Sequence, residues 1–405
     1  PFNYIDSLCD PEMYGTLQWA IRKVNETYGP RVINFSIPGT EPHTILLNNF
    51  LPQITKDVII DGTSQPGYSD ENPVITIDGQ DLMAWCFNAY GLNSLGISGF
   101  NFIGFIKNGI SLGGCQNAII KSNNIALKNS NYDSYLKKGY FARITAYNCE
   151  NISLYNNELN TIFEGIPTPG PYNYGIMLTN STNCNIGSTE QNFSNKIYDC
   201  YTGVYLDSCQ NIKISANEIY NNENGILLEY GSNNSKKKPM IISYDEGIIS
   251  GVAEIGDIIE VFGGIGEEDA NEFLGTVQAD QYGDWTLTAT TSYEYLIATA
   301  TDQNNNTSMF CDEILVSPTC AKPTNLSATE GVSTSHTLTW EGQEGVTYNV
   351  AVGIKELSPI YENWIVSYNQ NITDNQITIT DLDENTEYEF YVNANCGTEV
   401  SHWAG

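Results

Sequence analysis

The chain of 405 residues contains few of the side chains that usually perform acid, base or nucleophilic catalysis. Its only histidines are His43, His336 and His402, so no histidine is available in the central part of the chain to activate a serine or cysteine nucleophile. No set of cysteines and histidines has the spacing of a zinc site. We therefore assign no catalytic residue and expect neither a metal ion nor another cofactor.

Carboxylates in the central part of the chain are scattered rather than paired. They include Asp133, Glu158, Glu164, Asp199, Asp207, Glu218, Glu223 and Glu229. Glycoside hydrolysis needs two carboxyl groups held at a set separation, and the sequence shows no motif of that kind.

Aromatic and basic residues concentrate in two segments, 126–142 and 160–173, and at their borders. The aromatic residues are Tyr132, Tyr135, Tyr140, Phe141, Phe163, Tyr172 and Tyr174, and the basic ones are Lys128, Lys137, Lys138 and Arg143. Aromatic faces suit stacking on sugar rings, and clustered Lys and Arg suit carboxylate or sulfate groups. The predicted ligand-binding residues are Tyr132, Tyr135, Lys137, Lys138, Tyr140, Arg143, Phe163, Glu164 and Tyr172. The alternative is that these rings only pack the segments onto the scaffold.

The scaffold that must hold these segments is a repeat. Its anchor is an asparagine, found at Asn93, Asn117, Asn151, Asn183, Asn211 and Asn233, and successive anchors lie 22 to 34 residues apart. Such spacing indicates a repeat unit of about 22 residues with insertions of varying length, as in a solenoid.

Apolar residues recur at fixed positions before each anchor. Seven residues before it stand Cys86, Ile110, Ile144, Ile176, Val204 and Ile226, and five before it stand Asn88, Leu112, Ala146, Leu178, Leu206 and Leu228. This alternation is typical of strands, and each unit is too short to bury an apolar face alone. The pattern therefore predicts a parallel β-helix over residues 30–235, right-handed because of the crossover preference of parallel strands.

Both long insertions leave the repeat at the same position. Each follows the apolar residue eight past its anchor, Ile125 in one unit and Leu159 in the next. Because they share this position, we expect the insertions to emerge side by side and to line one surface groove. Loops on a rigid scaffold often carry binding function.

The repeat is flanked by other elements. Residues 16–28 place Leu17, Ala20, Ile21 and Val24 on one helical face, which predicts a helix that caps the open end of the solenoid. After Asn233 a charged linker ends at Pro239, and alternating strands follow. The predicted domains are 1–235, 236–318 and 319–405, so the fold class is all-β, with a capped β-helix followed by two antiparallel β-sandwiches.

The motif DGTSQPGY, from Asp61 to Tyr68, resembles secreted right-handed parallel β-helix proteins of Bacteroidetes type, in the pectin-lyase-like superfamily. The resemblance covers roughly the first 235 residues and implies export. Residues 236–318 resemble bacterial Ig-like modules. Related chains often continue into a domain for type IX secretion, so we expect this chain to be part of a longer surface protein.

Residues 319–405 resemble a fibronectin type III domain. The resemblance makes Trp340 the core indole and Tyr388 the corner tyrosine whose hydroxyl bonds to the main chain. It also implies a disulfide between Cys320 and Cys396. The family's last strand follows the position of Trp403, and because the chain ends at Gly405 we expect this strand to be missing.

The formal net charge of −31, with only 17 Lys and Arg, argues against nucleic acids and anionic membranes as partners. No apolar run is long enough to span a bilayer. Cys115 and Cys149 occupy equivalent positions of adjacent units, within range of a disulfide, and either a bridge or a ladder of free thiols fits the spacing.

Three functions remain open. The first is a secreted or cell-surface, adhesin-like protein that displays a glycan-binding or surface-binding β-helix on sandwich spacers, with an extracellular polysaccharide or cell-surface glycan as partner. The second is a polysaccharide lyase or hydrolase, for which Lys137, Lys138, Arg143 and Glu164 would be candidates. The third is a purely structural surface protein.

Overall fold

The structure is a computed structural model that describes residues 14–27, 31–70, 72–128, 141–162, 172–190, 193–266, 268–330, 334–355, 364–397 and 399–405. Almost all of its regular elements are β-strands. They form two compact units. The first unit contains residues 1–236, 268–271 and 304–309, and the second contains residues 237–267, 272–303 and 310–405.

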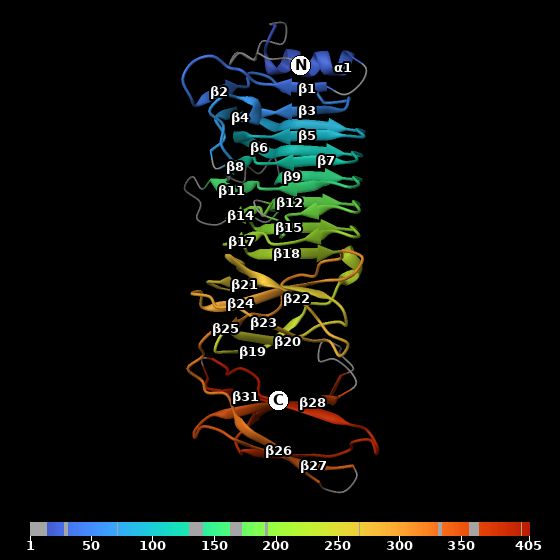
Figure 1. The fold of residues 1–405 in the computed structure, drawn as a ribbon, viewed down its shortest axis with the longest axis vertical. Helices are drawn as coiled ribbons and strands as arrows, with labels where there is room; N and C mark the ends of the chain where they lie inside the picture. Colours follow the sequence, from blue (N-terminus) through green and yellow to red (C-terminus); the bar gives the residue numbers. More distant parts are fainter. Residues whose placement is uncertain are drawn as a thin grey trace. The chain divides into compact units, whose positions relative to one another are not determined.

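The first unit is a β-helix of stacked coils (Figure 1). One sheet has the order β1 (Arg31–Asn34), β3 (Val58–Asp61), β5 (Leu95–Ser98), β7 (Ala118–Lys121), β10 (Ser153–Tyr155), β13 (Asn185–Ile186) and β16 (Lys213–Ile214). Every pair in it is parallel. Each coil adds one strand to this sheet and then turns to the next face.

The other sheet of the first unit covers two faces. On one side lie β17 (Glu218–Tyr220), β14 (Lys196–Tyr198), β11 (Glu158–Ile162) and β8 (Asn124–Lys128). On the other lie β9 (Phe141–Tyr147), β12 (Asn173–Thr179), β15 (Thr202–Asp207) and β18 (Asn224–Glu229). The long strand β6 (Phe100–Gly113) joins both sides and pairs with β4 (Ile75–Tyr90), which pairs with β2 (His43–Leu46).

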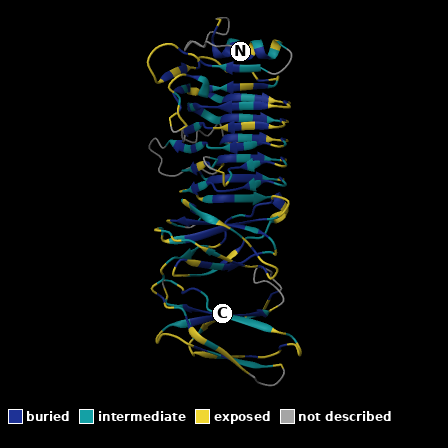
Figure 2. Ribbon diagram, viewed as in Figure 1, coloured by how far each residue is buried: buried dark blue, intermediate teal, exposed yellow. Residues whose placement is uncertain are grey.

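The predicted inward column is confirmed. The strand register pairs Ile110 with Ile144, Ile144 with Ile176, Ile176 with Val204 and Val204 with Ile226. All five side chains are at most 2% exposed, and buried positions alternate with more accessible ones along strands such as β3 and β7 (Figure 2). The apolar core therefore lies inside the coils, as expected from strand periodicity.

The repeat unit assigned to Asn93 is displaced by one residue from the predicted alignment. The register pairs Phe87, not Cys86, with Ile110, and it pairs Leu95 with Ala118. Ser94 therefore takes the place of Asn117, and Asn93 is not an anchor. The register of β4 against β6 also shifts twice between Asp78 and Trp85, before the displaced residues.

The other five anchors adopt the left-handed conformation that asparagine tolerates well. Their φ angles are 48° at Asn117, 57° at Asn151, 56° at Asn183, 58° at Asn211 and 48° at Asn233. This conformation suits a turn between two strands of a coil.

A second, buried asparagine ladder was missed by the sequence analysis. It contains Asn123, Asn157, Asn195 and Asn217, none more than 2% exposed. Asn157 shows the pattern: its Oδ1 accepts from the main-chain N–H of Asn123 at 3.2 Å, and its Nδ2 donates to the carbonyl of Ile120 at 2.9 Å. The ladder satisfies main-chain groups where the coil turns.

The cysteine column is a hydrogen-bond ladder of free thiols and hydroxyls. Its members are Cys115, Cys149, Ser181, Cys209 and Ser232. Cys149 Sγ accepts from Cys115 N–H at 3.4 Å and donates to the carbonyl of Tyr147 at 3.4 Å. Cys115, Cys149 and Cys209 are free in the structure, which resolves the two alternatives in favour of the unbridged ladder.

The DGTSQPGY motif acts as a side-chain extension of the sheet. Gln65 accepts from Ile37 N–H at 2.7 Å and donates to the Ile37 carbonyl at 3.1 Å. Ser64 Oγ accepts from Phe35 N–H at 2.7 Å. The Ser64 and Gln65 side chains thus bond to the main chain just beyond the end of β1. This accounts for these two polar residues of the motif.

The N-terminal cap is present as predicted. Helix α1 spans Leu17–Glu26, and the Thr16 side chain accepts from Trp19 N–H as N-cap. Leu17, Ala20, Ile21 and Val24 are at most 1% exposed. Asn25 also donates to the carbonyl of Gln53 at 2.7 Å, which holds the helix on the first coils.

The second unit contains two antiparallel sandwiches. The first has one sheet of β19 (Met240–Asp245), β20 (Ile248–Val252) and β23 (Asp284–Thr288), and another of β22 (Glu272–Gln278), β21 (Ile258–Gly264), β24 (Tyr295–Thr301) and β25 (Ile314–Leu315). The second has one sheet of β26 (Thr324–Glu330), β27 (His336–Glu341) and β30 (Gln376–Ile379), and another of β29 (Ile365–Ile372), β28 (Thr347–Ile354) and β31 (Tyr388–Asn395).

The last sandwich has the expected internal marks. Trp340 is 4% exposed in its core, Tyr388 OH accepts from Asp383 N–H at 2.9 Å, and Cys320 is disulfide-bonded to Cys396. The final residues return along β31, with antiparallel bridges from Val400 and Ala404. That the family's last strand after Trp403 is missing stays a prediction.

Candidate functional site

Most of the predicted binding residues lie outside the described residues. These are Tyr132, Tyr135, Lys137, Lys138, Tyr140, Phe163 and Glu164. The strand ends that flank the two segments are described, and they are neighbours: Ile162 pairs with Lys128, and Asn173 pairs with Phe141. The two insertions therefore leave from, and return to, adjacent coils.

Arg143 does not line a surface groove as expected, because its side chain is 0% exposed. It occupies a column that is otherwise glycine, at Gly109, Gly175, Gly203 and Gly225. A Cβ at Gly175 would lie 2.3 Å from Ile197 Cγ2 and 2.5 Å from the Gly203 carbonyl oxygen. Neighbouring backbone and side chains therefore lie very close to the glycine positions. Arg143 occupies the same position in its own coil, and its side chain extends into the protein.

The Arg143 guanidinium joins the flanks of both insertions. Its Nε donates to the Asn160 carbonyl at 2.8 Å, and its Nη1 donates to the Tyr174 carbonyl at 3.1 Å. Further hydrogen bonds run from Nη1 to Asn173 Oδ1 and from Nη2 to Thr161 Oγ1. Burial lowers the pKa of Arg143, an effect that nearby Cys200 and Asp199 oppose. Its role in the structure is to hold the two flanks together.

The flanking aromatic residues differ in exposure. Tyr172 is 49% exposed and has a φ of 74°, immediately before β12. Tyr174 is 5% exposed and its ring centroid lies 4.7 Å from that of Tyr205. Tyr174 therefore packs internally, as the alternative interpretation expected, whereas Tyr172 stays accessible.

An exposed aromatic column lies on the outer face of the sheet that begins at these flanks. Its register places Tyr90, Gly113, Tyr147, Thr179, Asp207 and Glu229 in line on successive coils. Tyr90 is 63% exposed and Tyr147 is 51% exposed. We call these six positions the tyrosine column.

Gly113 leaves room for the Tyr90 ring within the tyrosine column. A Cβ at Gly113 would lie only 2.7 Å from Cδ2 of Tyr90, so the ring extends across the position where a side chain would stand. Tyr90 and Tyr147 are two coils apart, about 9.6 Å at the usual strand spacing. The two rings thus offer separate aromatic contacts along the coil stack.

The sequence did not reveal the tyrosine column because alignment on Asn93 misplaces this coil by one residue. Each member lies four residues before its anchor, so the signal was present in the repeat. Alignment on Asn93 put Ala89 in this position, whereas alignment on Ser94 puts Tyr90 there.

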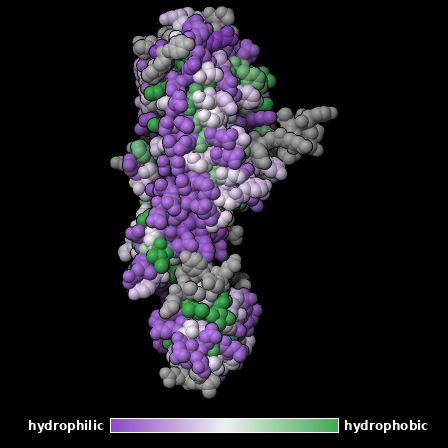
Figure 3. All heavy atoms as spheres, turned by 90° about the vertical axis from the view of Figure 1, so that its right-hand side faces the viewer, coloured by the Kyte–Doolittle hydropathy of each residue, from purple (hydrophilic) through white to green (hydrophobic). Residues whose placement is uncertain are grey.

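The neighbouring outward column carries no charge. It contains Asn88, Ser111, Thr145, Met177, Tyr205 and Leu227. Asp207 and Glu229 are the acids of the tyrosine column, and they lie at its C-terminal end. Both columns are thus uncharged around Tyr90 and Tyr147. The face of the protein drawn in Figure 3 is largely hydrophilic.

Two further tyrosines are bound within the protein. The Tyr198 and Tyr220 rings stack with centroids 5.1 Å apart and planes 3° apart. Tyr198 OH donates to Glu158 Oε1 at 2.6 Å and accepts from Asn160 Nδ2 at 2.7 Å. Burial, and next the hydrogen bond to Glu158, raise the pKa of Tyr198. Because their faces cover one another, these rings are poorer contacts for a ligand than Tyr90 and Tyr147.

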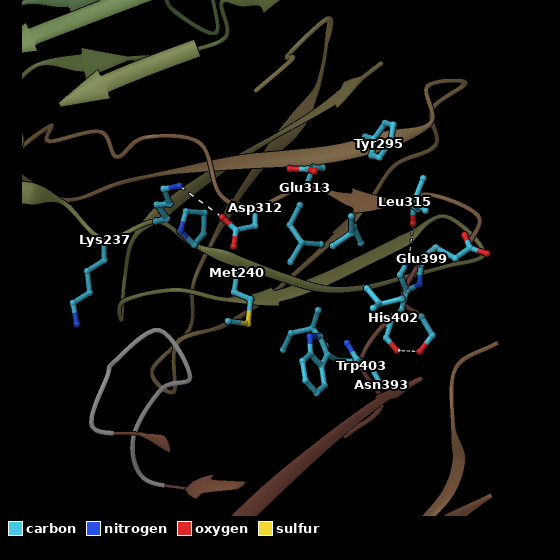
Figure 4. A pocket seen from close by; sticks show the side chains of 17 residues that line it. Lys237, Met240, Tyr295, Asp312, Glu313, Leu315, Asn393, Glu399, His402 and Trp403 are labelled. Carbon is cyan, nitrogen blue, oxygen red and sulfur yellow. Dashed lines mark hydrogen bonds and ion pairs between the residues drawn. The ribbon is translucent and has the colours of Figure 1, made fainter. Parts of the chain in front are cut away.

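A separate pocket of about 1140 Å³ lies in the second unit (Figure 4). Its lining includes Lys238, which is 3.7 Å from Asp312, and His402, whose Nε2 lies 2.6 Å from the Leu315 carbonyl. These charged and polar groups are engaged with one another. Within the described ranges, no group of three or more His, Cys, Asp or Glu side chains could hold a metal ion.

Comparison with known proteins agrees with this architecture. Residues 85–244 match the family described as right handed beta helix region, and residues 321–404 match the fibronectin type III domain. The chain therefore contains a right-handed β-helix region and a fibronectin type III domain. No curated protein matches the chain. No helix among the described residues is long and apolar enough to cross a membrane.

Two solved structures are among the similar ones. A two-domain fibronectin type III segment from chicken tenascin is 11% identical, with a TM-score of 0.18, and the match covers 42% of this chain and 95% of that one. A cytokine receptor complex is 16% identical, with a TM-score of 0.18, and the match covers 41% of this chain and 99% of that one.

Proposed function

We propose that the chain is a secreted or cell-surface, adhesin-like binding protein whose β-helix holds an extended, uncharged glycan along the tyrosine column. The observation that carries this proposal is the pair of exposed rings, Tyr90 and Tyr147, in one outward column of the β-helix. Aromatic rings that lack an internal partner favour ligands with apolar ring faces.

A neutral glycan is preferred over an anionic one because of the charges nearby. Arg143 is buried and contributes its guanidinium to main-chain and side-chain oxygens of the protein. Asp207 and Glu229 would repel an anionic chain at the C-terminal end of the column. The fibronectin type III domain and the disulfide support an extracellular location. Membership of the pectin-lyase-like superfamily, Bacteroidetes origin and type IX secretion remain part of the proposal.

A binding screen on immobilised polysaccharides tests the proposal. We expect retention on at least one neutral polysaccharide and weaker retention on polyuronates and sulfated glycans. Release of reducing ends or of unsaturated sugars from any of them would instead favour the lyase or hydrolase alternative. Loss of all retention, with the fold intact, would leave the structural-protein alternative.

A further inference from the structure

The last coil of the β-helix needs partners for its outer edge. A strand at the end of a solenoid has main-chain N–H and C=O groups directed away from the coil before it, and apolar side chains below them. At the N-terminal end α1 lies over the first coils. At the other end the corresponding groups belong to β16, β17 and β18, the last strand of each face.

Residues 304–309 meet the edge at β16. Ile214 N–H donates to Thr307 Oγ1 at 3.0 Å, and Thr307 N–H donates to the Ile212 carbonyl at 3.3 Å. Asn211 N–H donates to Asn306 Oδ1 at 2.8 Å. The last anchor, Asn233, donates from Nδ2 to the Thr307 carbonyl at 2.9 Å. Four hydrogen bonds therefore replace those that a further coil would make.

Residues 268–271 meet the edges at β17 and β18. Ile219 and Ala270 exchange two main-chain hydrogen bonds, of 2.9 and 2.7 Å. Asn221 N–H donates to Asp269 Oδ1 at 2.6 Å, and Gly225 N–H donates to Glu268 Oε2 at 3.0 Å. This segment thus reaches the strands of both remaining faces.

Both segments are buried where they touch the coil. Ala270, Asn306, Thr307 and Ser308 are each 0% exposed, and Asp269 is 8% exposed. Side chains that are buried and hydrogen-bonded in this way stabilise the contact, because an unpaired buried polar group is costly. The fit is that of an internal element of the fold.

We propose that residues 268–271 and 304–309 are the C-terminal cap of the β-helix, supplied by segments that the sequence places within the following module. The β-helix sequence up to residue 236 is then incomplete as a folding unit, because its terminal edge is completed only after residue 309 has been made. The cap makes the stability of the last coil depend on the later part of the chain.

Two substitutions at one position test the proposal in the full chain. Thr307→Val keeps the side-chain shape but removes the oxygen that accepts from Ile214 N–H, whereas Thr307→Ser keeps that oxygen. The measurement is amide hydrogen exchange, read at Ile214 in the last coil and at Ile144 in the middle of the stack. Thr286→Val, at an exposed position of β23, is the control for the change of residue type.

We expect Thr307→Val to speed exchange at Ile214 by about tenfold and to leave Ile144 unchanged, while Thr307→Ser and Thr286→Val match the unaltered chain at both residues. Unchanged exchange at Ile214 in Thr307→Val would overturn the proposal. If Thr307→Val does not fold, amide hydrogen exchange is measured at Asn211 in Asn306→Ala, which removes the acceptor of Asn211 N–H. Protection at Asn211 that survives this substitution would equally overturn it.

Discussion

The guanidinium of Arg143 donates from Nε to the main-chain carbonyl of Asn160, 2.8 Å away, and so joins the end of one insertion to the start of the other. Asn160 lies in β11, at the start of the second insertion, and Arg143 lies in β9, just after the first. The segments richest in aromatic and basic residues are thus tied together at their bases by a buried cation.

Replacement of Arg143 should therefore lower stability. Arg143→Ala leaves the Asn160 and Tyr174 carbonyls without their donors in a buried site, and we expect a loss of about 3 kcal/mol or more in the free energy of unfolding. Denaturant unfolding measures this. Arg22→Ala, at an exposed position of α1, is the control. Equal midpoints for Arg143→Ala and the control would contradict the structural role.

The thiol ladder predicts a difference between two substitutions of Cys149. Cys149→Ser keeps a group that accepts from Cys115 N–H and donates to the Tyr147 carbonyl, as Ser181 already does in the next coil. Cys149→Ala removes both hydrogen bonds and should cost about 1 kcal/mol more than Cys149→Ser. Thermal unfolding compares the two variants, and an alanine variant as stable as the serine variant would refute the ladder.

Asp269 predicts a pH dependence of stability. Burial raises the pKa of Asp269 above the ordinary value of 3.8. The pKa of this carboxyl is 3.8 in the unfolded chain and higher in the folded chain. Between these two values the folded chain binds more protons than the unfolded chain, so the free energy of unfolding falls as pH rises through this interval. Asp269→Asn keeps the acceptor for Asn221 N–H and removes the titration.

We therefore expect Asp269→Asn to be more stable than the unaltered chain at neutral pH. The difference should shrink as pH falls through this interval and vanish below pH 3.8, where Asp269 is protonated in both states. Urea unfolding at several pH values measures this. A difference between the two proteins that grows as pH falls would have the wrong sign. Asp280→Asn, at an exposed position, controls for loss of one negative charge.

Gly113→Ala separates binding from stability. A Cβ there would lie 2.7 Å from the Tyr90 ring, which can turn away because it is largely exposed. We expect the melting temperature to change little while affinity for the neutral polysaccharide falls severalfold. Gly114→Ala is a poor control because of its φ of 59°, so Ser111→Ala in the adjacent column is used. A Gly113→Ala variant with full affinity would show that the Tyr90 ring position is immaterial.

How much the sequence revealed differed between parts of the molecule. The column from Ile110 to Ile226 followed from strand periodicity, since one residue of each coil must face the bore. Asn93 was misplaced because the anchor position of its coil is occupied by Ser94, and the asparagine one residue earlier fits the repeat pattern equally well. Arg143 was predicted at the surface because it is charged. In the folded protein its guanidinium is buried, and the oxygens that accept its hydrogen bonds come from residues far along the chain.

The later modules show the same limit. Alternation and turns predicted the first sandwich after Pro239, whereas the second was predicted from its resemblance to a fibronectin type III domain. The role of Thr307 could not be foreseen, because its hydroxyl meets Ile214, 93 residues earlier, and only the folded chain brings them together. The boundaries predicted at 235 and 318 stay predictions for where independently stable units end.

The most direct test of the glycan-binding account is the affinity of Tyr90→Ala, Tyr147→Ala and the double variant for the neutral polysaccharide found in the screen. Isothermal titration calorimetry measures it, with Tyr282→Ala, 71% exposed in the second unit, as the matched control. Each substitution in the tyrosine column should cost about 1 kcal/mol of binding, additively in the double variant, with unchanged melting temperatures. If the double variant binds as tightly as the control, the tyrosine column is not the binding surface.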